Sequence, residues 1–482
     1  MTVRVESNLI GGAFVADTRG GTIPVTDPAT GATIGEVPAM TAEDLEPVLA
    51  AAVAGAATWR STGAIARGRV LFRLAELIRA EAAELAALIV AENGKTLAEA
   101  TGEVGKAAEF FEYYAGFGRS ASGELLPDAR PGTFALQLRE PVGPVLLVTP
   151  WNDPLLTPSR KLAPALIAGD SVVVKPATET PLILLRLAAL AHRAGLPGGV
   201  LGTVTGRGSV IGDALTGDPR LRAVSFTGST SVGLALQRRL AGTGTRVQTE
   251  MGGKNAAVVL ADADLDLAVP VVVAGAFGQA GQRCTATSRL IVERSVAGEV
   301  RRRVAAAVEA LVVAPGTEPG AEMGPVVSRA AQRDIRDRVT AGLAEGSRVI
   351  AAGTLPPGLA DDAAFVEPLF LEIERGGSLW RDEVFGPVLG LTEVDGLEEA
   401  IEAANDSAYG LSASVFTSSL DAAHRFVEGV DAGQVSVNQP TSGWDVHQPF
   451  GGFKDSGSPF KEQGAEALRF YTRVKTAAVR VR

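Results

Sequence analysis

The sequence predicts an α/β fold in which helices cover both faces of parallel sheets. From Val142 onward, short apolar runs alternate with helical segments, which is the pattern of a parallel sheet. The pattern restarts after Gly252, so a domain boundary is expected near that residue. A chain of 482 residues is also too long for one hydrophobic core, and two or three domains are expected.

The part of the chain before Val142 is expected to be mainly helical. A Thr-Ala-Glu-Asp sequence is typical of a helix N-cap and predicts a helix over residues 41–59. A second amphipathic helix is expected over residues 65–93, where an Asn-Gly pair ends it, and helical character continues over residues 97–117. Alternation over residues 133–139 suits an edge strand.

The alternating region gives a specific series of elements. Before Gly252, strands are expected at 145–148, 171–174, 200–204 and 223–226, with helices at 155–168, 182–194 and 210–216. After Gly252, strands are expected at 256–260, 288–292, near 349 and at 413–416, with helices up to 277, after 330 and from 398. Residues 474–481 are expected to form a β-rich tail.

Composition limits the partners and the compartment. The net charge is −10 and there is no basic run, which argues against a nucleic-acid partner. The longest apolar stretch, at residues 267–277, contains a proline and is too short to span a bilayer, so no membrane association is expected. A single cysteine cannot form an internal disulfide, so a cytoplasmic protein is expected.

The single cysteine, Cys284, is the first candidate catalytic residue. It lies in a polar, glycine-rich loop between two apolar runs, where packing gives no reason to keep a thiol. Glu250 lies 34 residues upstream and is followed by two glycines that let backbone amides approach closely. A thiolate with a nearby carboxylate base suits covalent catalysis, although an inert cysteine is the alternative. One cysteine and three scattered histidines exclude a cysteine-rich zinc site, and no metal is expected.

Polar residues also follow three of the predicted strands, where parallel sheets bind ligands. Asn152 could donate an amide hydrogen to a developing oxyanion, or could simply form a turn. Lys175 could hold a ribose hydroxyl or a phosphate. Ser229 opens a helix whose backbone N–H groups could face a phosphate. Further on, Glu383 could bind a ribose diol, or could be a solvated surface acid.

The order and spacing of these motifs resemble the NAD(P)-dependent aldehyde dehydrogenase superfamily. The resemblance covers nearly the whole chain. It is carried by Pro-Trp-Asn ending at Asn152, the Lys175 loop, Phe-Thr-Gly-Ser ending at Ser229, Glu-Met-Gly-Gly-Lys-Asn starting at Glu250, Gly-Gln-Arg-Cys ending at Cys284, Glu-Val-Phe-Gly-Pro starting at Glu383, and Pro-Phe-Gly-Gly starting at Pro449.

The resemblance implies a fold and its domains. It implies the aldehyde dehydrogenase fold, with a Rossmann-like cofactor domain (residues 1–117 and 139–250) and an α/β catalytic domain (251–450). A small β oligomerisation element (118–138 and 451–482) is implied to make a homodimer or homotetramer.

It also implies a mechanism of aldehyde oxidation. Cys284 would attack the aldehyde to give a thiohemiacetal, and Asn152 would hold the oxyanion. After hydride transfer, Glu250 would activate water to hydrolyse the thioester, and Glu462 matches an acid that some members use in proton relay, with a helix-start acid as the alternative. Residues implied to bind the nicotinamide cofactor are Thr149, Pro150, Trp151, Lys175, Ala177, Thr178, Gly228, Ser229, Glu383 and Phe385.

Two residues, Thr178 and Arg160, bear on specificity. Many NAD-preferring members carry a glutamate where this chain has Thr178, and its loss would admit a 2′-phosphate beside Lys175, so NADP is favoured over NAD. Arg160 matches the position that binds the distal carboxylate in members acting on acid semialdehydes, with a structural ion pair as the alternative.

Residues 444–450 and 462–464 resemble the α-ketoglutarate semialdehyde (2,5-dioxopentanoate) dehydrogenase branch. Alternatives are succinate semialdehyde or a general aliphatic or aromatic aldehyde as substrate, a CoA-acylating relative, and a catalytically silent structural relative. Glu250 as a hydrolytic base argues against CoA acylation, and retention of Cys284, Asn152 and Glu250 together argues against a silent member.

Overall fold

The first sheet is fully parallel, as the alternating pattern predicts, but it has a fifth strand, β11, that was not expected. The computed structural model describes residues 6–120 and 123–480. The strand order is β11-β10-β7-β8-β9, and the central strands are buried on both faces, which explains their unbroken apolar sequences. The strands are β7 (Val145–Val148), β8 (Val172–Lys175), β9 (Leu201–Thr203), β10 (Ala223–Thr227) and β11 (Arg246–Glu250), and the helices between them are α5 (Leu156–Ala168), α6 (Leu182–Arg193), α7 (Gly208–Thr216) and α8 (Thr230–Leu240).

The N-terminal helices pack against this sheet, but one expected helix is wrong. Residues 65–93 form two helices, because the chain turns at Glu81. The carboxylate of Glu81 pairs there with Arg186 and Arg193 of α6, which fixes the break. The elements of this region are β1 (Asn8–Ile10), β2 (Ala13–Val15), β3 (Thr22–Thr26), β4 (Thr33–Pro38), η1 (Ala42–Asp44), α1 (Leu45–Ser61), α2 (Ala64–Ala80), α3 (Ala82–Asn93), α4 (Leu97–Gly116) and η2 (Phe117–Arg119).

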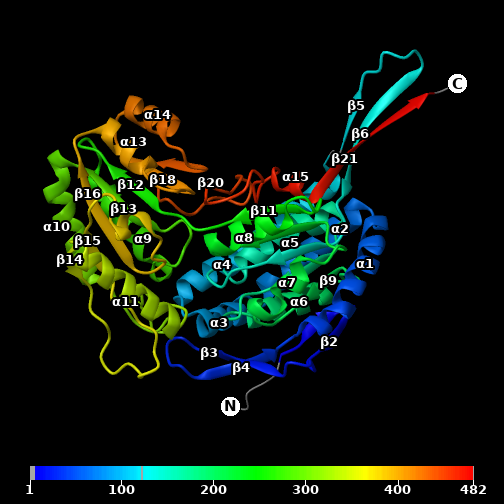
Figure 1. The fold of residues 1–482 in the computed structure, drawn as a ribbon, viewed down its shortest axis with the longest axis horizontal. Helices are drawn as coiled ribbons and strands as arrows, with labels where there is room; N and C mark the ends of the chain where they lie inside the picture. The colour runs from blue at the N-terminus through cyan, green and yellow to red at the C-terminus, as the bar shows by residue number, and fades with distance from the viewer. Residues whose placement is uncertain (1–5, 121–122, 481–482) are drawn as a thin grey trace.

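The second sheet lies in a separate lobe, as the restart after Gly252 predicts (Figure 1). Its order is β14-β15-β16-β13-β12-β18-β19, and all its neighbouring pairs are parallel except β14 with β15. Three of its strands, β15, β16 and β19, were not expected from the sequence pattern. The strands are β12 (Asn255–Val259), β13 (Thr287–Glu293), β14 (Arg348–Ala352), β15 (Leu369–Glu372), β16 (Val388–Val394), β18 (Ser412–Phe416) and β19 (Gln434–Val437).

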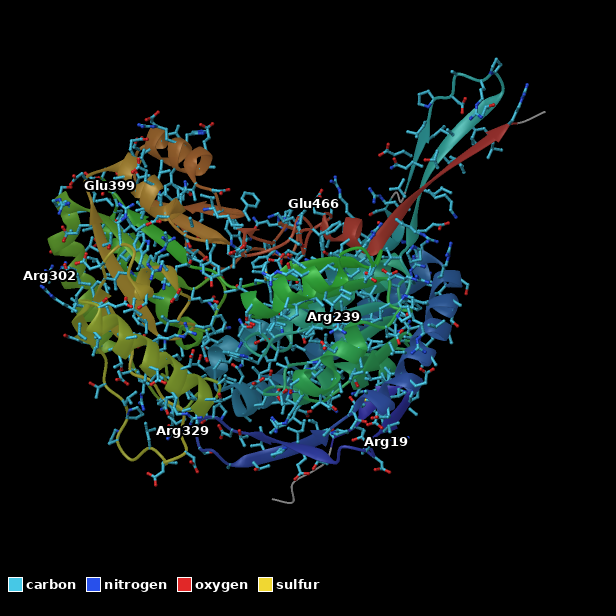
Figure 2. All side chains as sticks on the ribbon, viewed as in Figure 1. Arg19, Arg239, Arg302, Arg329, Glu399 and Glu466 are labelled. Atoms are coloured by element: carbon cyan, nitrogen blue, oxygen red, sulfur yellow. The ribbon has the colours of Figure 1, made fainter. Side chains whose placement is uncertain are left out.

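Helices surround the second sheet and enclose its apolar core. They are α9 (Leu265–Phe277), η3 (Gly278–Gly281), α10 (Arg294–Ala310), α11 (Arg329–Ala344), α12 (Ser378–Arg381), α13 (Leu397–Asn405) and α14 (Leu420–Gly429). Charged side chains such as Arg302 and Glu399 lie on the outer surface of this lobe, and Arg19 and Arg239 lie on that of the other (Figure 2).

A three-stranded antiparallel sheet forms an arm that projects from the body (Figure 1). It consists of β5 (Gly123–Leu126), β6 (Thr133–Pro141) and β21 (Thr472–Arg480). The expected edge strand at 133–139 is wrong, because β6 is the central strand: β21 pairs with it along its whole length and β5 pairs with its other side.

Residues 438–471, between β19 and the last strand of the arm, cross from the lobe of the second sheet to that of the first (Figure 1). The short strand β20 (Phe453–Lys454) of this segment pairs with β17 (Tyr409–Gly410), and its helix α15 (Ala467–Tyr471) packs on α5. The division of the chain into cofactor, catalytic and oligomerisation parts stays a prediction. Within the described residues, no helix combines the length and apolar character that a membrane span requires.

Candidate active site

Residues from both lobes line one cavity of about 590 Å³. Parts of the 150–153, 227–229, 251–252, 279–285 and 383–385 loops form its walls. The expected site residues that line it are Pro150, Trp151, Asn152, Arg160, Gly228, Ser229, Cys284, Glu383 and Phe385.

Close backbone packing fixes the loop that carries Cys284. Gln279 and Ala280 both have φ of 53°, and Gly281 has φ of 69°. A Cβ on Gly281 would clash with the carbonyl oxygen of Gly386, so only glycine fits there. The side chain of Asn255 also donates a 2.8 Å hydrogen bond to the carbonyl oxygen of Cys284. The backbone around Cys284 is therefore held from both sides.

The thiol of Cys284 is partly exposed and lines the cavity. Burial raises its pKa to about 12, although the nearby charge of Arg160 opposes this shift. The thiol is therefore neutral at neutral pH, and a base must accept its proton before it can act as a nucleophile.

Glu250 is the buried carboxyl group that best suits the role of such a base. It ends β11 and is only 1% exposed. Neither of its carboxylate oxygens has a hydrogen-bond partner among the described residues. Burial, and next the charge of Glu462, raise its pKa well above the usual value. A carboxyl group with a raised pKa can exchange a proton near neutral pH.

Glu462 has the opposite environment, although it is equally buried. Its carboxylate accepts a hydrogen bond from Thr227 at 3.1 Å, lies 2.6 Å from Nε of Arg160 and pairs with Nζ of Lys161. Burial alone would raise its pKa, but Arg160 and Lys161 outweigh this and lower it. It does not start a helix, because α15 begins only at Ala467.

Asn152 follows β7 and lines the cavity. Its side chain forms no hydrogen bond with other described residues, whereas its carbonyl oxygen accepts a 2.8 Å bond from Lys95. The preceding carbonyl, of Trp151, accepts a 2.8 Å bond from Asn93. The backbone of this loop is thus fixed while the amide stays available to a ligand.

The other end of the cavity has groups that suit a dinucleotide. Gly228 and Ser229 precede α8, so free backbone N–H groups at the start of this helix lie at the wall. Glu383 accepts a 2.9 Å hydrogen bond from Gly253 N–H, and burial raises its pKa to about 7. Phe385 packs edge-on against Trp151, with ring centroids 5.3 Å apart.

Several expected residues do not line the cavity. Glu250 and Glu462 lie behind its wall. The others, which lie at the ends of β7 and β8, are Thr149, Lys175, Ala177 and Thr178. Thr149 N–H donates to the carbonyl of Lys175 at 3.1 Å, and Nζ of Lys175 donates to the carbonyl of Pro176 at 3.1 Å. Ala177 and Thr178 follow, partly buried, in the same loop.

Sequence reasoning assigned no role to several residues of the site. Arg283 lines the cavity directly before Cys284 and makes no side-chain hydrogen bond or ion pair within the described residues. Lys161 is fully buried beside Glu462. Phe450 lies under Arg160, whose guanidinium carbon is 4.4 Å from the ring centre. Arg283 and Phe450 stand within motifs quoted above, but side-chain direction in a loop has no periodicity that would identify them; Lys161 lies on α5 directly after Arg160.

The family model described as "Aldehyde dehydrogenase family" matches residues 14–477. The chain belongs to the aldehyde dehydrogenase family. It is therefore an NAD(P)-dependent oxidoreductase that acts on aldehydes, as the motifs predict.

Relatives of this aldehyde dehydrogenase span almost its full length. It is 42% identical to a 2,5-dioxopentanoate dehydrogenase of Saccharolobus solfataricus, over 90% of this chain and 91% of the relative. It is 36% identical to an alpha-ketoglutaric semialdehyde dehydrogenase of Bacillus subtilis, over 98% of both chains. A phenylacetaldehyde dehydrogenase of Pseudomonas fluorescens is 41% identical, over 98% of this chain and 95% of the relative.

Solved structures confirm the expected aldehyde dehydrogenase fold. A putative aldehyde dehydrogenase from Burkholderia cenocepacia superposes with a TM-score of 0.95 at 36% identity, covering 98% of this chain and 99% of that chain. Betaine aldehyde dehydrogenase from Staphylococcus aureus, solved in complex with NAD⁺, superposes with a TM-score of 0.95 at 32% identity, covering 98% and 94%. As a member of this family, the protein uses a nicotinamide cofactor.

The thiol pKa of about 12 predicts how this aldehyde dehydrogenase reacts with iodoacetamide in the absence of cofactor. The alkylation rate should rise about tenfold per pH unit between about pH 7 and 10, because only the thiolate reacts. Mass spectrometry measures it directly, since Cys284 is the only cysteine. N-acetylcysteine serves as control, and its alkylation rate should level off once the pH passes the thiol pKa of about 8.5. A protein rate that levels off below pH 9 contradicts the raised pKa.

Proposed function

We propose that this enzyme oxidises an acid semialdehyde, with α-ketoglutarate semialdehyde (2,5-dioxopentanoate) as the preferred substrate. The supporting observation is that two arginines, Arg160 and Arg283, line the same cavity as the Cys284 thiol. A guanidinium is well suited to bind a carboxylate. The names of the Saccharolobus and Bacillus relatives point to the same substrate.

The proposed reaction begins when the Cys284 sulfur attacks the aldehyde carbon, while the thiol proton passes to Glu250 and from there to solvent. The new C–S bond converts the carbonyl oxygen to an oxyanion, which the amide of Asn152 and the backbone N–H of Cys284 stabilise. A nicotinamide cofactor, when bound, would supply the acceptor for the hydride that leaves this carbon. Glu250 then removes a proton from water, and the water oxygen displaces the sulfur to release the carboxylic acid.

In this scheme the charges around Glu250 decide its role. Glu462 is already paired with Arg160 and Lys161, so it stays ionised and structural at neutral pH. Glu250 lacks such partners and can take up and release a proton. Glu462 can relay a proton only when its ion pairs open.

Cofactor residues follow from the same arrangement. Ser229 and the start of α8 are proposed to bind the pyrophosphate, with Glu383 and Lys175 binding the two riboses. Pro150, Trp151 and Phe385 are proposed to pack around the nicotinamide half, and Thr149, Ala177, Thr178 and Gly228 to complete the adenosine and phosphate contacts.

Replacing Arg160 tests the substrate. Arg160→Leu should raise KM for α-ketoglutarate semialdehyde about 10- to 100-fold, the loss expected for a charged hydrogen bond. KM for an uncharged aldehyde of equal length should change by less than about threefold. Arg160→Lys keeps a positive charge beside Glu462, so it separates the loss of substrate binding from the loss of the ion pair. The matched control is Arg239→Leu, which removes an arginine from the outer surface. Equal effects on both aldehydes would reject the carboxylate role.

The panel of substrates should also include succinate semialdehyde and phenylacetaldehyde. Wild-type kcat/KM should be highest for α-ketoglutarate semialdehyde. If phenylacetaldehyde is oxidised as efficiently, the acid-semialdehyde proposal is wrong.

NADP is proposed as the preferred form of the cofactor. Thr178 leaves the space beside Lys175 without the glutamate that repels a 2′-phosphate, although the exposed Glu179 also lies near enough to affect Lys175 electrostatically. Thr178→Glu should lower kcat/KM for NADP at least tenfold and leave that for NAD within about threefold. A wild-type kcat/KM for NAD tenfold above that for NADP would exclude the preference.

We also propose that the arm joins copies of this chain into a homodimer or homotetramer. Leu125 is 70% exposed and Val474 is 55% exposed on its strands, an apolar surface that a second copy would cover. The double variant Leu125→Glu/Val474→Glu should be monomeric in light scattering. The control is Leu420→Glu on α14, in the lobe of the second sheet, because Leu420 is an apolar residue that is 76% exposed away from the arm. A monomeric wild-type protein would contradict the proposal.

A further inference from the structure

A buried charged cluster lies directly behind the Asn152 loop. Lys95, between α3 and α4, has a side chain that is 1% exposed. Its ammonium group donates to Oε2 of Glu103 at 2.5 Å, to the carbonyl oxygen of Asn152 at 2.8 Å and to Oδ1 of Asp153 at 3.2 Å. An ammonium has three hydrogens, so these three acceptors use all of them.

The cluster also fixes the start of α5. The second oxygen of Glu103 accepts hydrogen bonds from the backbone N–H groups of Leu155 and Leu156, at 2.8 and 3.0 Å. Glu103 therefore ties Lys95 to the helix that carries Arg160. Burial alone would lower the pKa of Lys95, but the charges of Glu103 and Asp153 outweigh this and raise it, so Lys95 stays charged.

The same cluster reaches the loop of the nucleophile. Oδ1 of Asp153 also accepts a 3.0 Å hydrogen bond from the side chain of Gln279, five residues before Cys284. The backbone N–H of Gln279 donates to Glu99 on α4 at 2.6 Å. One ammonium group thus anchors Asn152 directly, whereas the backbone of the loop that ends at Cys284 has its own anchor in Glu99.

We propose that Lys95 is a positioning residue for the oxyanion site, which rests on the role proposed above for Asn152. Lys95 holds the backbone of Asn152, so that the side-chain amide meets the oxygen that becomes negative when Cys284 attacks. An oxyanion donor contributes about 10²- to 10³-fold to rate, and a shift of about 1 Å costs about 10²-fold. Lys95 itself does not line the cavity, whereas its partners Glu103 and Asp153 do.

Two variants separate positioning from folding. Lys95→Met removes the ammonium but leaves Glu103 buried without its partner, which is destabilising. The double variant Lys95→Met/Glu103→Gln removes both charges and keeps an oxygen to accept from Leu155 and Leu156. Asp170→Asn is the matched control: Asp170 is a fully buried carboxyl group that accepts from Gly143 N–H, far from the cavity lining.

Two reactions of the same thiol give the decisive comparison. Aldehyde oxidation forms an oxyanion, whereas alkylation by iodoacetamide forms none. In the double variant, kcat should fall about 10- to 100-fold, KM should change less than about threefold, and the alkylation rate of Cys284 should stay within about twofold. Asp170→Asn should leave all three unchanged.

Combination with Asn152→Ala completes the test. If Lys95 acts through Asn152, adding the double variant to Asn152→Ala causes no further loss of kcat. Parallel losses of kcat and alkylation rate, or an unchanged kcat, would overturn the proposal for Lys95. If Asn152→Ala itself retains wild-type kcat, the role proposed for Asn152 fails, and that result is distinct from a failure of Lys95.

Discussion

The active site depends on a close approach of three backbone segments that only glycine permits. Gly281, before the nucleophile, lies against the carbonyl of Gly386, and Gly253 lies against the carbonyl of Cys284. Gly252 lies against the carboxylate of Glu383. A Cβ at Gly281 or Gly253 would collide with that backbone, so the thiol loop, the segment after Glu250 and the Glu383 loop would have to separate. At Gly252 a Cβ would displace the carboxylate of Glu383.

Charge pairing distinguishes two equally buried carboxyl groups, Glu250 and Glu462, that do not line the cavity. Glu462 has Arg160 and Lys161 beside it and keeps a lowered pKa, while Glu250 has no hydrogen-bond partner among the described residues and a raised one. Different environments for two neighbouring acids are a common way to assign separate structural and acid–base roles. The thiol, with its own raised pKa, then depends on a group able to accept its proton.

The sequence predicted the fold well where the pattern was local and repetitive. The four strands expected between Val142 and Gly252 were confirmed to within one residue, because fully buried parallel strands have unbroken apolar sequences. The helix at 65–93 was wrong because its break at Glu81 depends on ion pairs with α6, and β6 was placed at an edge because its partner β21 is more than 300 residues away. Long-range partners leave no local signal.

The same limit applies to the site. The spacing of motifs predicted which segments meet, and the cavity contains nine of the expected residues. It offered an ion pair of Arg160 as an alternative but did not identify Glu462 as the partner, because the two residues come from segments far apart in the chain. Lys95 was not considered at all, since a lysine after a helix is ordinarily solvated and only the fold buries it against Asp153.

Trapping the covalent intermediate tests the central claim most directly, namely that Cys284 bonds to the aldehyde carbon and Glu250 drives its hydrolysis. Glu250→Gln protein would be mixed with NADP and α-ketoglutarate semialdehyde, quenched in acid and analysed by intact mass spectrometry and peptide mapping. The account predicts one acyl group per chain, attached to Cys284, that persists in the variant and is absent from Cys284→Ser/Glu250→Gln. An unmodified Cys284, or acylation at any other residue, would contradict it.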